Sequence, residues 1–208
     1  MAVTQHSHAD VRARALEDLR RFDVILDGHF DYGRGVHGRL YLNPHGLLQS
    51  PATIWRVAQD LIDVIPPSLT GNADVIAGPV TGGALLAHTM AGLLEGRRPM
   101  THPPYQFAPM GNESGEPTLS PFYARLMAGR RVLLADDVRN TGHTLKRCAE
   151  LVAAAGGTVI ATAQIVDRCA ALATLDVPNI ALIDYTAPPN YAAGSCPLCA
   201  AGVPITTF

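Results

Sequence analysis

The chain has 208 residues, which is enough for one domain with a sizeable core. Hydrophobic residues make up 48% and charged residues 16%, and a formal net charge of -2 gives no basic footprint for nucleic acid. No apolar run predicts a membrane span, and the first residues lack the pattern of a secretion signal. Four scattered cysteines are too few for a disulfide framework. We therefore expect one cytoplasmic domain, residues 1–208, without nucleic-acid or membrane partners.

The first predicted elements are two amphipathic helices with a glycine-rich segment between them. Residues 9–26 place apolar side chains on one helical face. Residues 27–48 are rich in glycine and aromatic residues, which is typical of short strands and turns. Ser50 followed by Pro51 predicts the N-cap and first turn of the second helix, which ends before a pair of prolines.

Strands and helices alternate along the rest of the chain. The predicted strands are 74–78, 131–135, 158–166 and 179–185, and the predicted helices between them are 84–94 and 144–157. This alternation favours a parallel sheet with helices on both faces. Residues 99–124 break the pattern because they are rich in proline and show little periodicity. A long segment of this kind is usually a lid or disordered, and we expect a mobile lid there.

The sequence VLLADDVRNTGHTL, residues 132–145, carries the strongest functional signal. It places Asp136 and Asp137 at the carboxyl end of a predicted strand, the edge where parallel sheets bind ligands. Adjacent carboxylates repel each other and are costly to bury, so they favour donors such as the two hydroxyls of a ribose. The next residues offer amides, threonine hydroxyls and a glycine before a helix, which together suit a phosphate. A solvated loop capped by Asp and Thr is the alternative interpretation.

The stretch at 132–145 resembles the phosphoribosyl pyrophosphate (PRPP) signature of type I phosphoribosyltransferases, in which an apolar run precedes two acidic residues and a loop with Thr-Gly. Other segments resemble the orotate phosphoribosyltransferases in particular: GHFDYGRGVHGRLYLNP (28–44), VIAGPVTGGALLAH (75–88), IVDR (165–168) and CPLCAAGVPIT (196–206). The resemblance implies an α/β, type I phosphoribosyltransferase fold, with a Rossmann-like parallel sheet flanked by helices and a small hood. We expect the hood to come from 27–48 and from the C-terminal tail, 186–208.

The resemblance also implies an activity, namely transfer of a phosphoribosyl group from PRPP to a nucleobase, with orotate favoured and Mg²⁺ as cofactor. Asp136 and Asp137 would hold the ribose and favour its developing positive charge. The implied 5-phosphate site comprises Val138, Arg139, Asn140, Thr141, Gly142, His143 and Thr144, and the implied pyrophosphate loop comprises Val80, Thr81, Gly82 and Gly83. Arg168 and Tyr105 are the candidates for contact with the base. No side chain is assigned as a Mg²⁺ ligand, because PRPP would carry the ion, and the family implies a homodimer.

The segment 99–124 departs from the family pattern. The mobile catalytic loop of the family carries lysines, an arginine and a histidine, whereas His102 is the one potentially cationic side chain in this segment. A departing pyrophosphate needs positive charge, so Arg97 and Arg98 join Mg²⁺ as candidates to supply it. Two alternatives therefore stay open: a phosphoribosyltransferase for another base, and a non-catalytic protein that binds PRPP.

The C-terminal tail contains Cys196 and Cys199 in C-x-x-C spacing. Zinc normally takes four protein ligands, and no second pair of ligands is evident in the sequence, so we expect a turn with two free thiols instead. His29 and His37 are interpreted as turn and packing residues of the hood.

Overall fold

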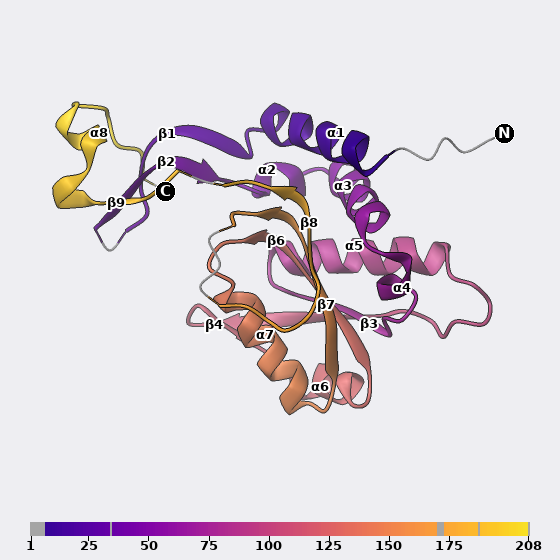
Figure 1. Cartoon of the computed structure of the whole chain (residues 1–208). Coiled ribbons are helices and arrows are strands. Elements are labelled where there is room, and N and C mark those ends of the chain that lie inside the picture. Colours follow the sequence, from indigo (N-terminus) through magenta and orange to yellow (C-terminus); the bar gives the residue numbers. More distant parts are fainter. Residues whose placement is uncertain (1–6, 34, 170–172, 187, 208) are drawn as a thin grey trace.

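The computed structural model describes residues 7–33, 35–169, 173–186 and 188–207, so a few positions of the expected hood and tail lie outside the described residues. Within the described residues, the main sheet has six strands in the order β5-β4-β3-β6-β7-β8 (Figure 1). Five of these strands are parallel, and β5 pairs antiparallel with β4. The strands are β3 (Val75–Pro79), β4 (Gln106–Glu113), β5 (Glu116–Thr118), β6 (Arg131–Arg139), β7 (Thr158–Asp167) and β8 (Asn179–Asp184).

Helices cover both faces of this sheet, which confirms the predicted fold class (Figure 1). Side chains alternate across the faces, so Ile76 and Leu133 lie in one buried cluster and Val75 and Leu134 in the other. The first cluster includes residues of α1 (His8–Arg21), α3 (Pro51–Val64) and α5 (Gly82–Gly96), and the second includes residues of α6 (Pro121–Met127) and α7 (His143–Ala154). No helix within the described residues is both long enough and apolar enough to cross a membrane.

The first two long helices begin where the sequence predicts. The Ser7 side chain accepts from the backbone N–H of Asp10, whose carboxylate accepts in return from Ser7, and this reciprocal capping fixes the start of α1. Ser50 caps α3 through the backbone N–H of Thr53, and Pro51 fills the first helical position. Short helices α2 (His45–Leu48) and α4 (Pro67–Thr70) flank α3.

A second, smaller sheet contains the segments expected to form the hood. Its strands are β1 (Ile25–Asp31), β2 (Val36–Leu42) and β9 (Tyr191–Ala192), which pair antiparallel in that order. A short 3₁₀ turn, η1 (Ala193–Ser195), and α8 (Pro197–Ala200) follow β9, and Figure 1 shows them in yellow beside this sheet. The tail then returns to β1, where Thr206 donates to the carbonyl of His29 and accepts from the N–H of Asp31.

The segment 99–124 contains regular structure, so the prediction of a structureless insertion was wrong for much of it. Strand β4 pairs with the whole of β3, and its residues Ala108 and Met110 are fully buried. The strand was missed because Pro109 stands inside it, and proline normally argues against a strand in the middle of a sheet. Over this stretch β4 is an edge strand, since β5 pairs only with Gly111–Glu113, and an edge strand tolerates proline. That the β4–β5 hairpin moves as a lid stays a prediction.

Candidate functional site

The main crevice of the sheet lies between β3 and β6. The chain passes from β3 through α5 to β4 on one side, and from β6 through α7 to β7 on the other. Open α/β sheets bind their ligands at such a reversal of strand order, beyond the carboxyl ends of the strands. A cavity of about 350 Å³ lies there, lined by Pro79, Val80, Thr81, Gly82, Asn112, Gly115, Pro117, Asp136, Asp137, Val138 and Thr144.

The aspartate pair lies inside β6 rather than beyond its end, because this strand is longer than predicted. It continues beside β7 as far as the pairing of Arg139 with Asp167. On the other side, its pairing with β3 stops at Leu134. Asp136 and Asp137 therefore keep an ordered strand conformation through β7, while the side facing β3 is open to the crevice.

The two carboxylates have different environments. Asp136 is 7% exposed, and its Oδ1 accepts from the backbone N–H of Asp137 at 2.9 Å. Asp137 is half-buried, and its Oδ1 accepts from the N–H of Val138 at 2.6 Å. Burial, and secondly the charge of Asp137, raise the pKa of Asp136 well above its usual range. The ionised form of a buried carboxyl group beside a second carboxylate is stabilised by any hydroxyl that donates a hydrogen bond to it.

The glycine loop after β3 packs directly against both aspartates. A Cβ on Gly82 would lie 1.8 Å from Oδ2 of Asp137, and a Cβ on Gly83 would lie 2.8 Å from Oδ1 of Asp136. Only glycine leaves room for this close approach of backbone and carboxylate. The preceding residues Val80 and Thr81 are exposed at the mouth of the crevice, and the peptide bond between them is cis. The structure thus brings the predicted pyrophosphate loop and the predicted ribose carboxylates into contact.

The predicted 5-phosphate loop leads from β6 into α7. Gly142 is the N-cap of α7 with φ of +83°, and a Cβ there would lie 2.1 Å from the carbonyl oxygen of Ala173. No side chain of the described residues caps α7, so its first N–H groups remain available to an anion. Val138 and Thr144 line the crevice cavity, whereas Asn140, Thr141 and His143 are exposed in the loop.

Two arginines beside this loop have different partners. Arg139 donates from Nη1 to Oδ2 of Asp167 at 2.7 Å, and both side chains are largely buried. Arg168 donates from Nη1 to Oδ1 of Asn140 at 3.0 Å, while its Nε is buried and has no partner among the described residues. Arg139 therefore helps to hold the loop against β7, and Arg168 lies at the loop with unused hydrogen-bonding capacity.

Three further residues that were predicted to belong to the site lie away from the crevice in the structure. Arg97 and Arg98 follow the last turn of α5, whereas the glycine loop is at its first turn, and Tyr105 directly precedes β4 at the amino edge of the sheet. Arg97 pairs with Asp63, Arg98 pairs with Glu95, and the Tyr105 hydroxyl donates to the carbonyl of Thr70. Arg97 and Tyr105 line a separate hollow of about 760 Å³. The structure does not bring these three side chains to the crevice of their own chain.

The crevice also contains residues that the sequence did not single out. Asn112, Gly115 and Pro117 of the β4–β5 hairpin form part of its wall. Residues 111–116, GNESGE, are polar and rich in glycine, which is typical of a hairpin turn. This pattern was the available sequence signal for the hairpin. An adjoining hollow of about 370 Å³ shares Thr144 and two hairpin residues with the crevice. Its charged lining residues are Lys146, Arg147, Glu116 and Glu150, and Arg147 pairs with Glu150.

In an α/β protein, a crevice with paired carboxylates, a close-packed glycine loop and an uncapped helix start suits a phosphorylated sugar. Residues 47–178 match the family model described as "Phosphoribosyl transferase domain", and the chain belongs to this family. Within it, the chain is similar to orotate phosphoribosyltransferases. The relative from Erythrobacter litoralis is 32% identical over 191 residues, which cover 92% of this chain and 93% of that protein.

Solved structures support the fold. The orotate phosphoribosyltransferase of Aeropyrum pernix aligns with a TM-score of 0.63 at 21% identity, covering 81% of this chain and 92% of that one. The Mycobacterium tuberculosis orotate phosphoribosyltransferase in complex with PRPP aligns with a TM-score of 0.56 at 18% identity, covering 84% of this chain and 89% of that one.

Proposed function

We propose that this protein is a transferase that moves the phosphoribosyl group of PRPP to orotate, giving orotidine 5′-phosphate and pyrophosphate in pyrimidine nucleotide biosynthesis. The observation that carries the proposal is the contact between the Gly82–Gly83 backbone and the carboxylates of Asp136 and Asp137. It joins the groups suited to pyrophosphate and to ribose in one cavity, which the start of α7 also borders. The 32% identity to an orotate phosphoribosyltransferase favours orotate as the acceptor.

Each part of PRPP has matching groups in the crevice. Asp136 and Asp137 accept hydrogen bonds from the ribose hydroxyls, and the amides of 138–144 bind the 5-phosphate at the positive end of α7. The backbone of Val80 to Gly83 binds pyrophosphate. As the bond between C1 and the leaving oxygen lengthens, positive charge develops on the ribose, and the carboxylates stabilise it. The base nitrogen then attacks C1, so the protein mainly orients the reactants and no covalent nucleophile is needed.

Magnesium fits the donors of this crevice. Hard oxygen ligands suit Mg²⁺, and the cavity wall offers the carboxylates of Asp136 and Asp137 and the amide of Asn112. These are the residues that would hold the ion as it arrives with PRPP. When bound, Mg²⁺ supplies positive charge to the leaving pyrophosphate.

The remaining positive charge comes from α7 in this proposal. The β4–β5 hairpin in the crevice wall carries no Lys, Arg or His, but Lys146 and Arg147 line the adjoining hollow. Arg168 is assigned to the carboxylate of orotate, because a planar guanidinium binds a carboxylate through two parallel hydrogen bonds. Tyr105 has no place in the mechanism, since it lies at the opposite edge of the sheet.

The proposal includes a homodimer, in which Arg97 or Arg98 supplies positive charge to the crevice of the neighbouring subunit. Its support is that α3 and α5 each expose a large apolar side chain: Trp55 is 53% exposed and Leu85 is 43% exposed. Large exposed apolar side chains of this kind mark interaction surfaces when they gather. Sedimentation of the wild type and of Trp55→Glu tests this point, and a wild-type monomer would contradict it.

Pyrophosphate release from PRPP and Mg²⁺, measured with orotate and with a panel of purine and pyrimidine bases, tests the activity. The control is the double variant Asp136→Asn/Asp137→Asn. We expect release that depends on orotate and is lost in the variant. Release with another base only would identify a transferase for that base. Tight PRPP binding without release for any base would identify a non-catalytic binding protein.

A further inference from the structure

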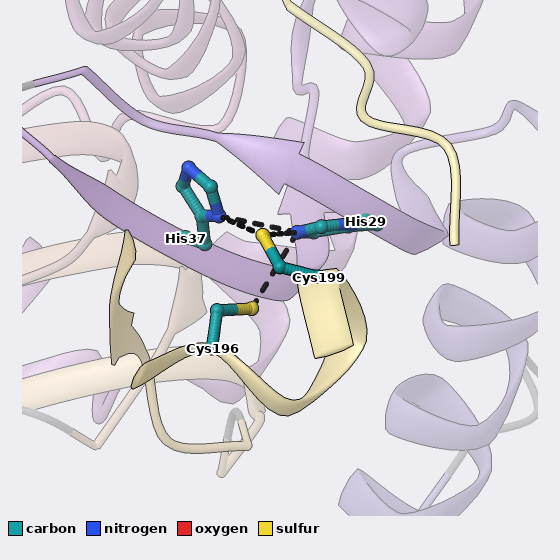
Figure 2. Close-up of side chains that lie close together, drawn as sticks. All are labelled: His29, His37, Cys196 and Cys199. Atoms are coloured by element: carbon teal, nitrogen blue, oxygen red, sulfur yellow. Dashed lines mark hydrogen bonds between the residues drawn. The ribbon is translucent and has the colours of Figure 1, made fainter. Parts of the chain in front are cut away.

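Four potential metal ligands come together in the small sheet and tail. His29 from β1, His37 from β2, and Cys196 and Cys199 at the start of α8 point toward one centre, as Figure 2 shows. One ligand atom from each residue lies within 4.8 Å of the other three, and no other group of three or more such residues was found among those described. His29 and His37 were predicted to be turn and packing residues, and the sequence did not suggest that they lie beside the two cysteines. We propose that these residues form a structural Zn²⁺ site.

Four of the six distances between the ligand atoms are close to those of a zinc tetrahedron. Zinc–sulfur bonds of about 2.3 Å and zinc–nitrogen bonds of about 2.0–2.1 Å imply edges of about 3.3 Å between two nitrogens and about 3.6 Å between nitrogen and sulfur. Nε2 of His29 lies 3.2 Å from Nδ1 of His37, 3.5 Å from Sγ of Cys196 and 3.7 Å from Sγ of Cys199. Sγ of Cys199 lies 3.2 Å from Nδ1 of His37. These four of the six edges are within about 0.4 Å of the ideal values, and the other two are no longer than 4.8 Å.

The surroundings prepare these atoms to bind a metal. Nδ1 of His29 lies 2.8 Å from the carbonyl oxygen of Val203. A carbonyl only accepts, so Nδ1 carries the proton and Nε2 presents its lone pair to the centre. Cys196 and Cys199 are free thiols rather than a disulfide. Two sulfurs and two imidazole nitrogens in a tetrahedral arrangement favour Zn²⁺ over the hard cations that prefer oxygen.

Apart from backbone hydrogen bonds to β1 and β2, the tail has little apolar burial to hold it in place. Within 188–207, Cys196 is the one buried residue, and the apolar side chains of Val203 and Ile205 are 39% and 46% exposed. So little apolar burial gives a weak hydrophobic contribution to docking of the tail. A metal would join residues that are 170 positions apart, His29 and Cys199, and would convert its binding free energy into order of the tail and β1.

The proposed role is structural and separate from the crevice. None of the four ligands lines the crevice cavity. They instead connect the β1–β2 hairpin to the segment that contains β9 and α8. We therefore expect metal removal to release the tail from the small sheet and to leave the main sheet folded.

The first test is the zinc content of the full-length chain without an affinity tag, measured by elemental mass spectrometry after exchange into metal-free buffer. Wild type and the control Cys169→Ser, which removes an exposed thiol outside the cluster, should each hold roughly one zinc per chain. Cys199→Ser should lose it. Cys199 is exposed, so its replacement tests the site even if replacement of the buried Cys196 prevents folding. Reconstitution with Co²⁺ should give a thiolate-to-metal charge-transfer band in wild type and not in Cys199→Ser.

The second test is limited proteolysis with and without a chelator. The chelator should expose the tail to cleavage in wild type and in Cys169→Ser, whereas Cys199→Ser should be cleaved equally in both conditions. Zinc well below one per chain after reconstitution of wild type would overturn the proposal. Equal zinc content in Cys199→Ser, or a disulfide between Cys196 and Cys199 in the purified protein, would overturn it too.

Discussion

Replacement of Gly82 by alanine tests whether the glycine loop and the aspartate pair form one active unit. The new Cβ would lie 1.8 Å from Oδ2 of Asp137, while ordinary contacts of a Cβ begin near 3.4 Å. The carboxylate or the loop must therefore move by more than 1 Å. Neither shift opens a cavity in the core, so we expect the variant to fold.

The expected cost falls on catalysis. A misplacement of about 1 Å in a positioned group can reduce the rate by about 100-fold, which corresponds to about 2.7 kcal/mol of transition-state stabilisation. We expect kcat/KM for PRPP to fall by at least this factor. Crowding should cost stability about 1–3 kcal/mol, partly offset by the better helix propensity of alanine.

Gly92→Ala is the matched control. It makes the same substitution on the exposed face of the same helix, where the new Cβ meets nothing within 4 Å apart from the local backbone of that helix and the neighbouring residues in the chain. This variant should keep wild-type kcat/KM and gain up to about 1 kcal/mol in unfolding free energy. The assay is steady-state pyrophosphate release, with urea unfolding in parallel. Gly82→Ala with kcat/KM within threefold of wild type would refute the assignment of Asp137 to the ribose.

Four further expectations concern groups around the crevice. Burial raises the pKa of Asp136 in the folded state, so the stability linked to its protonation is present below its ordinary pKa of 3.8 and is lost as pH rises toward the folded pKa. Asp136→Asn without PRPP should therefore be more stable than wild type near neutral pH and lose this advantage near pH 4. Urea unfolding of both proteins across this pH range tests the expectation. Asp167→Ala leaves Arg139 buried without its partner and should cost about 3–5 kcal/mol in unfolding free energy, whereas a loss under 1 kcal/mol would contradict a buried pair. Lys146→Ala should raise KM for PRPP by up to about tenfold with little change in kcat, and an unchanged KM would remove α7 as the source of charge. Burial raises the pKa of Cys148 to about 12, so alkylation at about pH 8 should spare it in the folded protein and modify the exposed Cys169.

The sequence predicts most of the main sheet because its strands are buried on both faces. Such strands read as continuous apolar runs, as in residues 131–135, and the helices between them end at glycines or prolines. Strand β4 escaped because Pro109 interrupts its apolar pattern, and only pairing with β3 shows that the edge of the sheet tolerates proline. The sequence pattern therefore predicts a strand or helix when the residues of that element are themselves periodic or apolar, and misses a strand such as β4 that depends on its partner.

The site was predicted to the extent that its residues are close in the chain. Asp136, Asp137 and the start of α7 form one continuous stretch, so their chemistry is visible in the sequence alone. Arg97 and Arg98 failed to reach the crevice because α5 has 15 residues and separates them from the glycine loop by about 22 Å along its axis. A helix such as α5 that begins beyond the carboxyl ends of the strands runs back toward their amino ends. The position of Arg97 and Arg98 therefore follows only once α5 and the direction of the strands are known.

The proposed zinc site shows the opposite case, in which spacing alone misleads. Cys196 and Cys199 lack a second ligand pair nearby in the chain, since the nearer histidine, His37, stands 159 positions before Cys196. Pairing of β9 with β2, and of the tail with β1, brings the two halves together. The crevice depends on a backbone that only glycine permits, whereas the tail has little buried surface of its own. A metal supplies at that end of the molecule the stability that close packing supplies in the main sheet.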